Sequence, residues 1–272
     1  MLTLSSLSVL ISLYAKESAD NFLCAINSIY KDQALKPSQI VLVKDGPLTP
    51  ELEDVIRYLT LELGEVLTIV ALKCNVGLGA ALNEGLKYCK YDLVARMDTD
   101  DIATPERFRW QVDFMQSNPT VAVSSGIVEE WNSDFSKKLS CRTLPLNHHE
   151  LLKFAKSRSP ISHPACIFRK SLILKVGGYP DIYPEDHLLW VRVLQQDHKI
   201  ANIPQVLLLM RTGEDFITRR GYKFLKGELK SYRIMYESNF LSLGELIRVS
   251  ALRTCVRLSP DFLKIWLYKN IR

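Results

Sequence analysis

The chain has 272 residues, 47% hydrophobic and 24% charged, which is the composition of a globular protein of one or two domains. This composition excludes a disordered chain, a collagen and a coiled coil, and no apolar run reaches the roughly 18 residues that a membrane-spanning helix needs. The net charge of +5 is unevenly spread, because 12 Lys/Arg stand against 4 Asp/Glu from Arg219 onwards, whereas residues 1–218 carry 23 against 26.

The stretch from Met1 to Ala15 is apolar, but it has no Lys or Arg before Lys16 and so lacks the basic start of a secretory signal peptide. The run from Leu7 to Leu13 fits a buried strand instead. Six cysteines are scattered without a C-x-x-C pair, which predicts neither a zinc site nor a disulfide framework and favours a reducing compartment.

Strand and helix patterns alternate along the first part of the chain. Strands are predicted at 8–14, 40–43, 66–72 and 91–97, and helices at 18–30, 51–61 and 78–89, with Ser18 as the first N-cap. This order predicts a parallel sheet with helices on both faces.

The pattern changes after Asp101. Thr104 and Pro105 predict the start of a helix, as its cap and its first residue. Strands are predicted at 121–124, 127–131, 165–168 and 203–210, with a helix after Pro184. Residues 132–147 are polar and irregular, which is typical of a mobile loop, and the pattern from Arg219 onwards is helical, basic and amphipathic.

Three carboxylates crowd the end of the fourth predicted strand, in the run Asp98-Thr99-Asp100-Asp101. Ligands of open α/β sheets bind at the carboxyl ends of strands. Clustered carboxylates repel one another unless a cation neutralises them, and oxygen ligands select Mg²⁺ or Mn²⁺, which can bridge to a diphosphate. The alternative is a solvated acidic turn that begins the next helix.

Other strand ends carry further candidates. Gly77-Leu78-Gly79 half matches the dinucleotide fingerprint, but Leu82 stands where the third glycine belongs, which disfavours a nicotinamide site. Tyr14 and Asp45 end the first two strands, where a ring and a carboxylate can hold a nucleobase by stacking and by accepting its N–H. Taken alone, each residue favours the structural interpretation, with Asp45 as a turn residue and Tyr14 as a core aromatic.

Two candidates lie further along the chain. Glu185 and Asp186 open a predicted helix, where acids either favour the helix dipole or supply a catalytic base facing the metal. His163 precedes a strand and is a candidate contact for phosphate or acceptor, with a structural role as the alternative.

Taken together, these segments resemble the family 2 glycosyltransferases over residues 6–212. The resemblance is carried by Ser8–Tyr14, Ile40–Gly46, Asn75–Gly85, Asp98–Asp101, His163–Ala165, Phe168–Lys170 and Glu185–Asp186. It implies an α/β fold of the GT-A type, a nucleotide-sugar-binding sandwich with a mostly parallel central sheet and a helical C-terminal extension. The implied catalytic domain spans 1–215, with a nucleotide-binding half at 1–101 and an acceptor-binding half at 102–215, and the basic amphipathic extension spans 216–272.

The resemblance also implies roles for single residues. For the nucleotide-sugar, Tyr14 and Asp45 are implied to contact the uracil, and Asn75 and Gly77 to form the adjoining loop. Asp98 is implied to lie near the ribose, and Asp101 beside the sugar. The residues implied for the metal, Mn²⁺ or Mg²⁺, are Asp98 and Asp100. The remaining roles are Asp186 as general base in a pair with Glu185, and His163 and Arg169 as contacts of acceptor or phosphate. Two segments depart from the family pattern, Ser12-Leu13-Tyr14-Ala15 and Lys44-Asp45-Gly46-Pro47.

The implied reaction is a single displacement that inverts the anomeric centre. A base takes the proton of the acceptor hydroxyl as that hydroxyl attacks the anomeric carbon, and no covalent nucleophile is required. The short form of the chain resembles bacterial enzymes that assemble O-antigen or exopolysaccharide repeat units. Transfer of galactose or glucose from a UDP-sugar to GlcNAc-diphosphoundecaprenol in a β-1,3 linkage is therefore expected, with UDP-GlcNAc, UDP-GalNAc, dTDP-rhamnose or another lipid-linked acceptor as alternatives.

The basic tail fits such an acceptor at the cytoplasmic face of the inner membrane, where polybasic attraction contributes roughly 1 kcal/mol per residue. The basic candidates are Arg219, Arg220, Lys223, Lys226, Lys230 and Arg233, and the apolar ones are Leu246, Ile247, Val249, Leu263, Ile265, Trp266 and Leu267. The alternative is that these helices cover the catalytic domain.

Two other classes of protein fit less well. A sugar-nucleotidyltransferase needs a glycine-rich phosphate loop after the first strand, and residues 14–20 contain no glycine. A non-enzymatic module that binds nucleic acid through the tail leaves the acidic cluster unexplained. No nucleic-acid partner is therefore expected.

Overall fold

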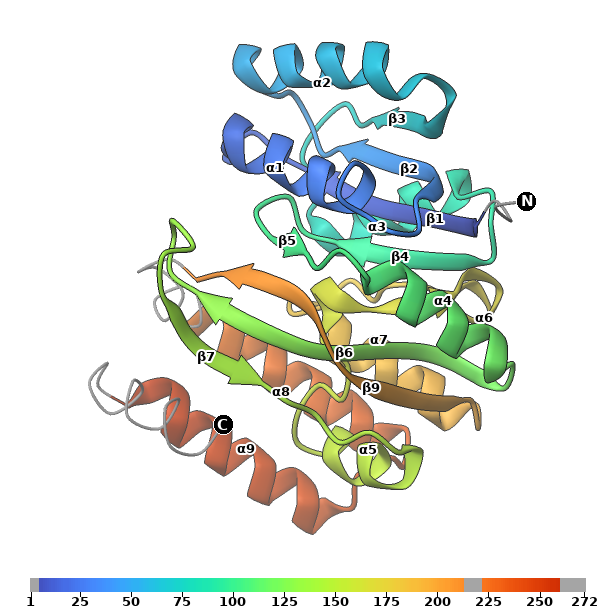
Figure 1. Ribbon diagram of the computed structural model, residues 1–272. Coiled ribbons are helices and arrows are strands. Elements are labelled where there is room, and N and C mark those ends of the chain that lie inside the picture. The colour runs from blue at the N-terminus through green and yellow to red at the C-terminus, as the bar shows by residue number, and fades with distance from the viewer. Residues whose placement is uncertain (1–4, 213–221, 260–272) are drawn as a thin grey trace.

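The computed structural model describes residues 5–212 and 222–259. Within these ranges the strands form one nine-stranded sheet in the order β3-β2-β1-β4-β8-β6-β9-β5, with β7 paired to β6 (Figure 1). Its first four strands are parallel neighbours, as predicted: β1 (Ser5–Leu13), β2 (Pro37–Lys44), β3 (Leu67–Ala71) and β4 (Leu93–Met97).

Helices cover both faces of this parallel region, because its strands are apolar on both sides. On one face, alternate residues of β1 from Leu7 to Leu13 pack with α1 (Ala19–Tyr30), α2 (Pro50–Leu63) and α4 (Arg107–Ser117). On the other face, Leu10 packs with α3 (Leu78–Tyr88). Ser18 caps α1 by accepting from the Asn21 amide, which confirms the predicted start.

The second half of the sheet mixes strand directions. Its strands are β5 (Ile102–Ala103), β6 (Val121–Trp131), β7 (Lys138–Arg142), β8 (Ile167–Arg169) and β9 (Lys199–Arg211). β8 is antiparallel to both β4 and β6, whereas β6 and β9 are parallel over most of their length. The remaining short elements are η1 (Gly64–Val66), α5 (His148–Ala155), η2 (His163–Ala165), α6 (Lys170–Lys175) and α7 (Asp186–Gln195).

Three local predictions were wrong. The strands expected at 121–124 and 127–131 are one strand, in which Gly126 lets Leu207 and the Gln205 carbonyl approach closely. The loop expected at 132–147 contains β7, which pairs with β6. Thr104 does not cap α4, because its hydroxyl donates to the Val206 carbonyl and the helix begins three residues later.

The extension forms a helical hairpin of α8 (Tyr222–Glu237) and α9 (Leu243–Leu258), which lie together beside the second half of the sheet (Figure 1). A capping box of Ser242 and Glu245 starts α9. An apolar cluster that includes Val191 of α7 and Met235 of α8 joins the hairpin to α7. Among the described residues, no helix is long and apolar enough to cross a membrane.

The hairpin separates the predicted tail residues into two sets. Leu246 and Val249 were expected in a lipid interface, but they pack in the apolar cluster with α7, so that expectation was wrong for both. Ile247 is 61% exposed. Lys226, Lys230 and Arg233 are exposed on α8. Arg219, Arg220, Leu263, Ile265, Trp266 and Leu267 lie outside the described residues, as does the predicted boundary at 215.

Candidate functional site

The three aspartates after β4 lie together. Asp98, Asp100 and Asp101 each offer a carboxylate oxygen, and these oxygens all lie within 4.8 Å of one another. Asp101 is 2% exposed; its Oδ1 accepts from the Arg211 amide at 2.9 Å, and its Oδ2 is buried without a hydrogen-bond partner. A buried, unpartnered carboxylate oxygen beside two further carboxylates fits a hard divalent cation such as Mn²⁺ or Mg²⁺.

The electrostatics of this cluster lead to the same conclusion. Burial, reinforced by the charge of Asp98, raises the pKa of Asp100 to about 6. Burial, together with Asp100 and then Asp98, holds the pKa of Asp101 well above its usual value. Carboxylates with such raised pKa values gain strongly from a bound cation, because its charge favours their ionised form.

A buried arginine supports the cluster from the strand itself. Arg96 of β4 is 1% exposed, and its guanidinium pairs with the Asp98 carboxylate. Arg96 was not among the residues predicted for the site from the sequence. A charged residue inside the buried strand Leu93–Met97 was the available signal, because a buried charge is rarely tolerated without a partner.

The predicted nucleotide contacts gather at neighbouring strand ends. Asp45, 4% exposed at the end of β2, accepts from the amides of Val76 at 2.7 Å and Gly77 at 3.2 Å. The Asn75 side chain donates to the Asp45 carbonyl at 3.3 Å. Tyr14 follows β1 and is half-buried. Each Asp45 oxygen keeps a further lone pair, so the carboxylate can still accept from a nucleobase N–H.

Glycines make this loop possible. A Cβ on Gly46 would lie 2.7 Å from the Asn75 nitrogen, and Gly77 has a φ of 87°. A side chain at either position would be strained or would push the two turns apart. Gly46 therefore allows the close approach of the two turns, and Gly77 allows a backbone conformation that other residues rarely adopt.

The candidate base lies at the start of α7. Asp186 is half-buried, and its Oδ2 accepts from the Ser159 hydroxyl at 2.8 Å. Glu185 is 6% exposed, and burial, with a smaller contribution from Asp186, raises its pKa to about 7. A Cβ on Gly79 of α3 would lie 3.3 Å from the Glu185 Cβ, so the helix after the nucleotide loop packs directly on the acidic pair.

One cavity of about 600 Å³ brings the aspartate cluster and the acidic pair together, whereas Tyr14, Asp45, Asn75 and Gly77 are not among its lining residues. Its catalytic-domain lining includes Arg96, Asp98, Asp100, Asp101, His163, Glu185 and Asp186. The hairpin contributes Phe224, Glu228, Tyr232, Leu252, Arg253, Val256 and Arg257. Sequence reasoning missed this second wall, because the tail pattern does not reveal which catalytic residues it packs against.

The two predicted acceptor contacts differ in position. His163 lines the cavity, where its Nε2 hydrogen-bonds the Tyr179 hydroxyl at 3.1 Å. Arg169 does not join the site: it pairs with Leu93 at the start of β4, and its guanidinium donates to the carbonyls of Val121 and Met115. The expected acceptor role of Arg169 is therefore replaced by a structural one.

Sequence comparison identifies relatives along the whole chain. The family model described as "Glycosyl transferase family 2" matches residues 8–177. The chain is 39% identical to the amylovoran biosynthesis glycosyltransferase AmsE of Erwinia amylovora, over 97% of this chain and 98% of that protein. It is 37% identical to a UDP-Gal:alpha-D-GlcNAc-diphosphoundecaprenol beta-1,3-galactosyltransferase of Escherichia coli, over 97% of this chain and 95% of that protein.

Solved structures share the fold. The mannosyltransferase PcManGT of Pyrobaculum calidifontis, in complex with GDP-Man and Mn²⁺, is 15% identical with a TM-score of 0.66, covering 98% of this chain and 81% of that one. TarS of S. aureus, in complex with UDP-GlcNAc, is 18% identical with a TM-score of 0.64, covering 91% and 71%. The fold is thus of the GT-A type, as predicted, and the chain belongs to glycosyl transferase family 2 and is a glycosyltransferase.

Proposed function

We propose that the protein is an inverting, metal-dependent hexosyltransferase that adds galactose or glucose from a UDP-sugar to GlcNAc-diphosphoundecaprenol in a β-1,3 linkage. The product would be a lipid-linked intermediate in the assembly of an O-antigen or exopolysaccharide repeat unit. The observation that carries the proposal is one cavity lined by both the aspartate cluster and the Glu185–Asp186 pair. The named activity of the 37% identical relative supports the choice of donor and acceptor.

The donor is assigned to the strand ends of the first half. The carboxylate of Asp45 would accept the uracil N–H, with Tyr14, Asn75 and Gly77 beside the nucleotide. Asp98 and Asp100 would hold Mn²⁺ or Mg²⁺, and Asp98 and Asp101 would lie along the ribose and sugar. The metal, when bound, supplies positive charge that stabilises the leaving diphosphate.

The acceptor side is assigned to the acidic pair. The Asp186 carboxylate would accept the proton of the GlcNAc hydroxyl. At the same time the oxygen of that hydroxyl would bond to the anomeric carbon of the donor, and the bond from this carbon to the diphosphate of UDP would break. Burial raises the pKa of the adjacent Glu185 carboxyl to about 7, which reduces the negative charge that it places beside Asp186 near neutral pH. Direct displacement turns an α-linked donor into a β-glycoside.

A lipid-linked diphosphate suits the rest of the cavity wall. Arg142 and Arg158 line it beside apolar residues of α9 such as Leu252 and Val256. Guanidinium groups suit phosphate oxygens, and apolar side chains suit a polyprenyl chain. The exposed lysines of α8 would meet anionic headgroups at the cytoplasmic face of the inner membrane.

A donor screen tests the proposal. The purified protein is supplied with GlcNAc-diphospho-lipid and, in turn, UDP-galactose, UDP-glucose, UDP-GlcNAc, UDP-GalNAc and dTDP-rhamnose, and NMR of the product reads the anomer and the linkage. The expected product carries a β-1,3-linked galactose or glucose. A product from another donor would keep the family but replace the proposed sugar, and an α-linked galactose or glucose product would overturn the inverting mechanism.

A further inference from the structure

The α8–α9 hairpin packs directly on the segment that carries the acidic pair. A Cβ on Gly227 of α8 would overlap the carbonyl oxygen of Tyr183, two residues before Glu185. The rings of Tyr183 and Phe224 meet edge-to-face, with centroids 5.5 Å apart. The first turn of α7 is also covered, because the rings of His187 and Tyr232 lie 5.9 Å apart.

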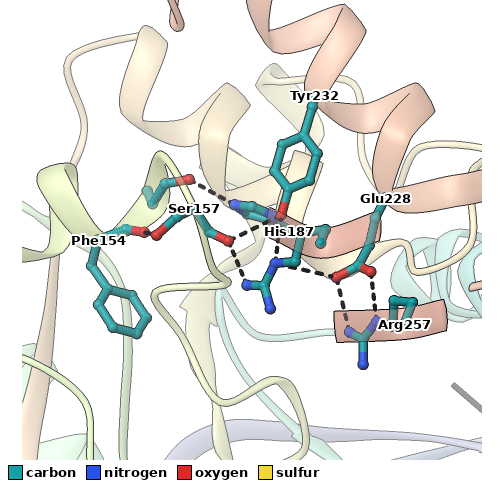
Figure 2. Close-up of polar contacts among 8 residues, drawn as sticks. Phe154, Ser157, His187, Glu228, Tyr232 and Arg257 are labelled. Atoms are coloured by element: carbon teal, nitrogen blue, oxygen red, sulfur yellow. Dashed lines mark hydrogen bonds and ion pairs between the residues drawn. The ribbon is translucent and has the colours of Figure 1, made fainter. Parts of the chain in front are cut away.

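The hairpin also forms hydrogen bonds with the turn that follows α5 (Figure 2). The Ser157 carbonyl accepts from Arg253 at 2.6 Å and from the Tyr232 hydroxyl at 3.0 Å. Lys156 and Glu245 form an ion pair at 2.6 Å. Two residues beyond Ser157, the Ser159 hydroxyl donates to Asp186. A continuous path of contacts therefore runs from α8 and α9 to the candidate base.

A buried ion pair lies beside the two hairpin residues that bond to Ser157. Glu228 and Arg257 form two hydrogen bonds, at 2.8 and 3.0 Å, and are 8% and 7% exposed (Figure 2). Arg253 lies 3.8 Å from Glu228 and donates to the Tyr232 hydroxyl at 3.2 Å. The bidentate pair fixes the Glu228 carboxylate beside Arg253. Arg253 and the Tyr232 hydroxyl hold the turn through their bonds to the Ser157 carbonyl.

We propose that Tyr232 and Arg253 are positioning residues that act on Asp186 through the turn at Ser157–Ser159. Held by the hairpin, the turn keeps the Ser159 hydroxyl on one Asp186 oxygen and leaves the other oxygen aimed at the acceptor. Transfer is sensitive to this alignment, because small misplacements of a reacting group lower its rate strongly. The inference rests on the proposed role of Asp186 as the base.

The first test removes a single oxygen from the hairpin. Tyr232→Phe keeps the ring against His187 and loses only the hydroxyl, and Tyr236→Phe, exposed on the same helix, is the matched control. We expect Tyr232→Phe to lower kcat about 3- to 10-fold, the range of a lost hydrogen bond, with the KM for UDP-sugar nearly unchanged and the thermal midpoint lowered by a few degrees. Tyr236→Phe is expected to match the wild type in all three.

A double-mutant cycle then tests the path. If Tyr232 acts through the turn, its removal adds little once the Ser159 hydroxyl is gone, so kcat of Tyr232→Phe/Ser159→Ala should equal that of Ser159→Ala within about twofold. In the control cycle with Tyr236→Phe, the double variant should likewise match Ser159→Ala. Multiplicative losses for Tyr232→Phe and Ser159→Ala, or an unchanged kcat in Tyr232→Phe, would overturn the inference.

Asp186→Asn separates this inference from the proposed function. If that variant keeps normal turnover, the base assignment fails and the positioning role fails with it. If it is inactive while Tyr232→Phe and Ser159→Ala turn over normally, the base assignment stands and only the positioning role of the hairpin is rejected.

Discussion

The Nδ1 atom of His163 lies 3.7 Å from Oε1 of Glu185, and fewer than one tenth of either side chain is exposed. Burial, followed by the charge of Arg96, holds the pKa of His163 well below its ordinary value, so the imidazole is neutral at pH 7. Burial raises the pKa of Glu185 to about 7. The contact is therefore not an ion pair at pH 7, because the imidazole carries no charge.

The raised pKa of Glu185 predicts a pH-dependent stability. Unfolded, this carboxyl ionises near its ordinary value of 4.5, whereas in the fold it keeps its proton to about 7. Stability from this group is thus greatest below pH 4.5 and falls as pH rises to 7, by about 3 kcal/mol over the full interval. Glu185→Gln removes this dependence. Urea unfolding in the presence of a chelator measures the free energy of unfolding of both proteins at pH 5 and pH 8. Relative to the wild type, the variant should be more stable at pH 8 than at pH 5. The same stability difference at both pH values would contradict the raised pKa.

The aspartate cluster predicts a specific dependence on divalent cation. Asp100→Ala should abolish transfer, because it removes one of three oxygens that lie within 4.8 Å. Mn²⁺ should raise the thermal midpoint of the wild type but not of Asp100→Ala, since only a bound ion stabilises the fold. Asp113→Asn, an exposed aspartate on α4, controls for a loss of negative charge. Full activity of Asp100→Ala would refute its assignment as a metal ligand.

The acidic pair predicts a separation of binding from turnover. Asp186→Asn keeps the shape of the side chain and a group that can pair with the Ser159 hydroxyl, but it cannot accept a proton at neutral pH. We expect UDP-sugar affinity within about twofold of the wild type and a fall in kcat of at least about 100-fold, the usual contribution of a general base. Calorimetric titration with UDP and a steady-state assay measure the two quantities. A variant with ordinary turnover would locate the base elsewhere.

The order of the elements could be predicted from the sequence where strands are buried on both faces. Val41 of β2 and Leu10 of β1 lie in unbroken apolar runs, and these runs identified the parallel strands to within a few residues. β7 was missed because its residues are largely exposed and its pairing with β6 is not written in its own hydrophobic pattern. Thr104 was wrongly predicted as a helix cap because its hydroxyl donates instead to the Val206 carbonyl, which is about one hundred positions away and cannot be predicted from the local sequence.

The site shows the same division. Asp98, Asp100 and Asp101 are neighbours in sequence, so their cluster followed from the end of one strand. The hydrogen bond between Ser159 and Asp186 joins residues 27 positions apart in the sequence, and the one between Arg253 and Ser157 joins residues 96 positions apart. Contacts between residues so far apart depend on how the hairpin packs. Amphipathic periodicity predicts which face of a helix is buried, but not which other element that face contacts.

The proposed membrane association can be tested on the exposed face of α9. Leu243, Ile247 and Leu258 are 55%, 61% and 64% exposed and share one side of the helix, because their spacings of 4 and 11 residues are close to whole helical turns. Removing the whole tail would uncover the apolar cluster on α7, so point variants are the better probe. Leu243→Ser/Ile247→Ser should lower cosedimentation with vesicles containing anionic lipid about tenfold, since it removes two side chains that can enter the interface. Leu61→Ser, 88% exposed on α2, removes a comparable side chain elsewhere and should bind like the wild type. Equal binding by all three proteins would exclude this face of α9 as the membrane contact.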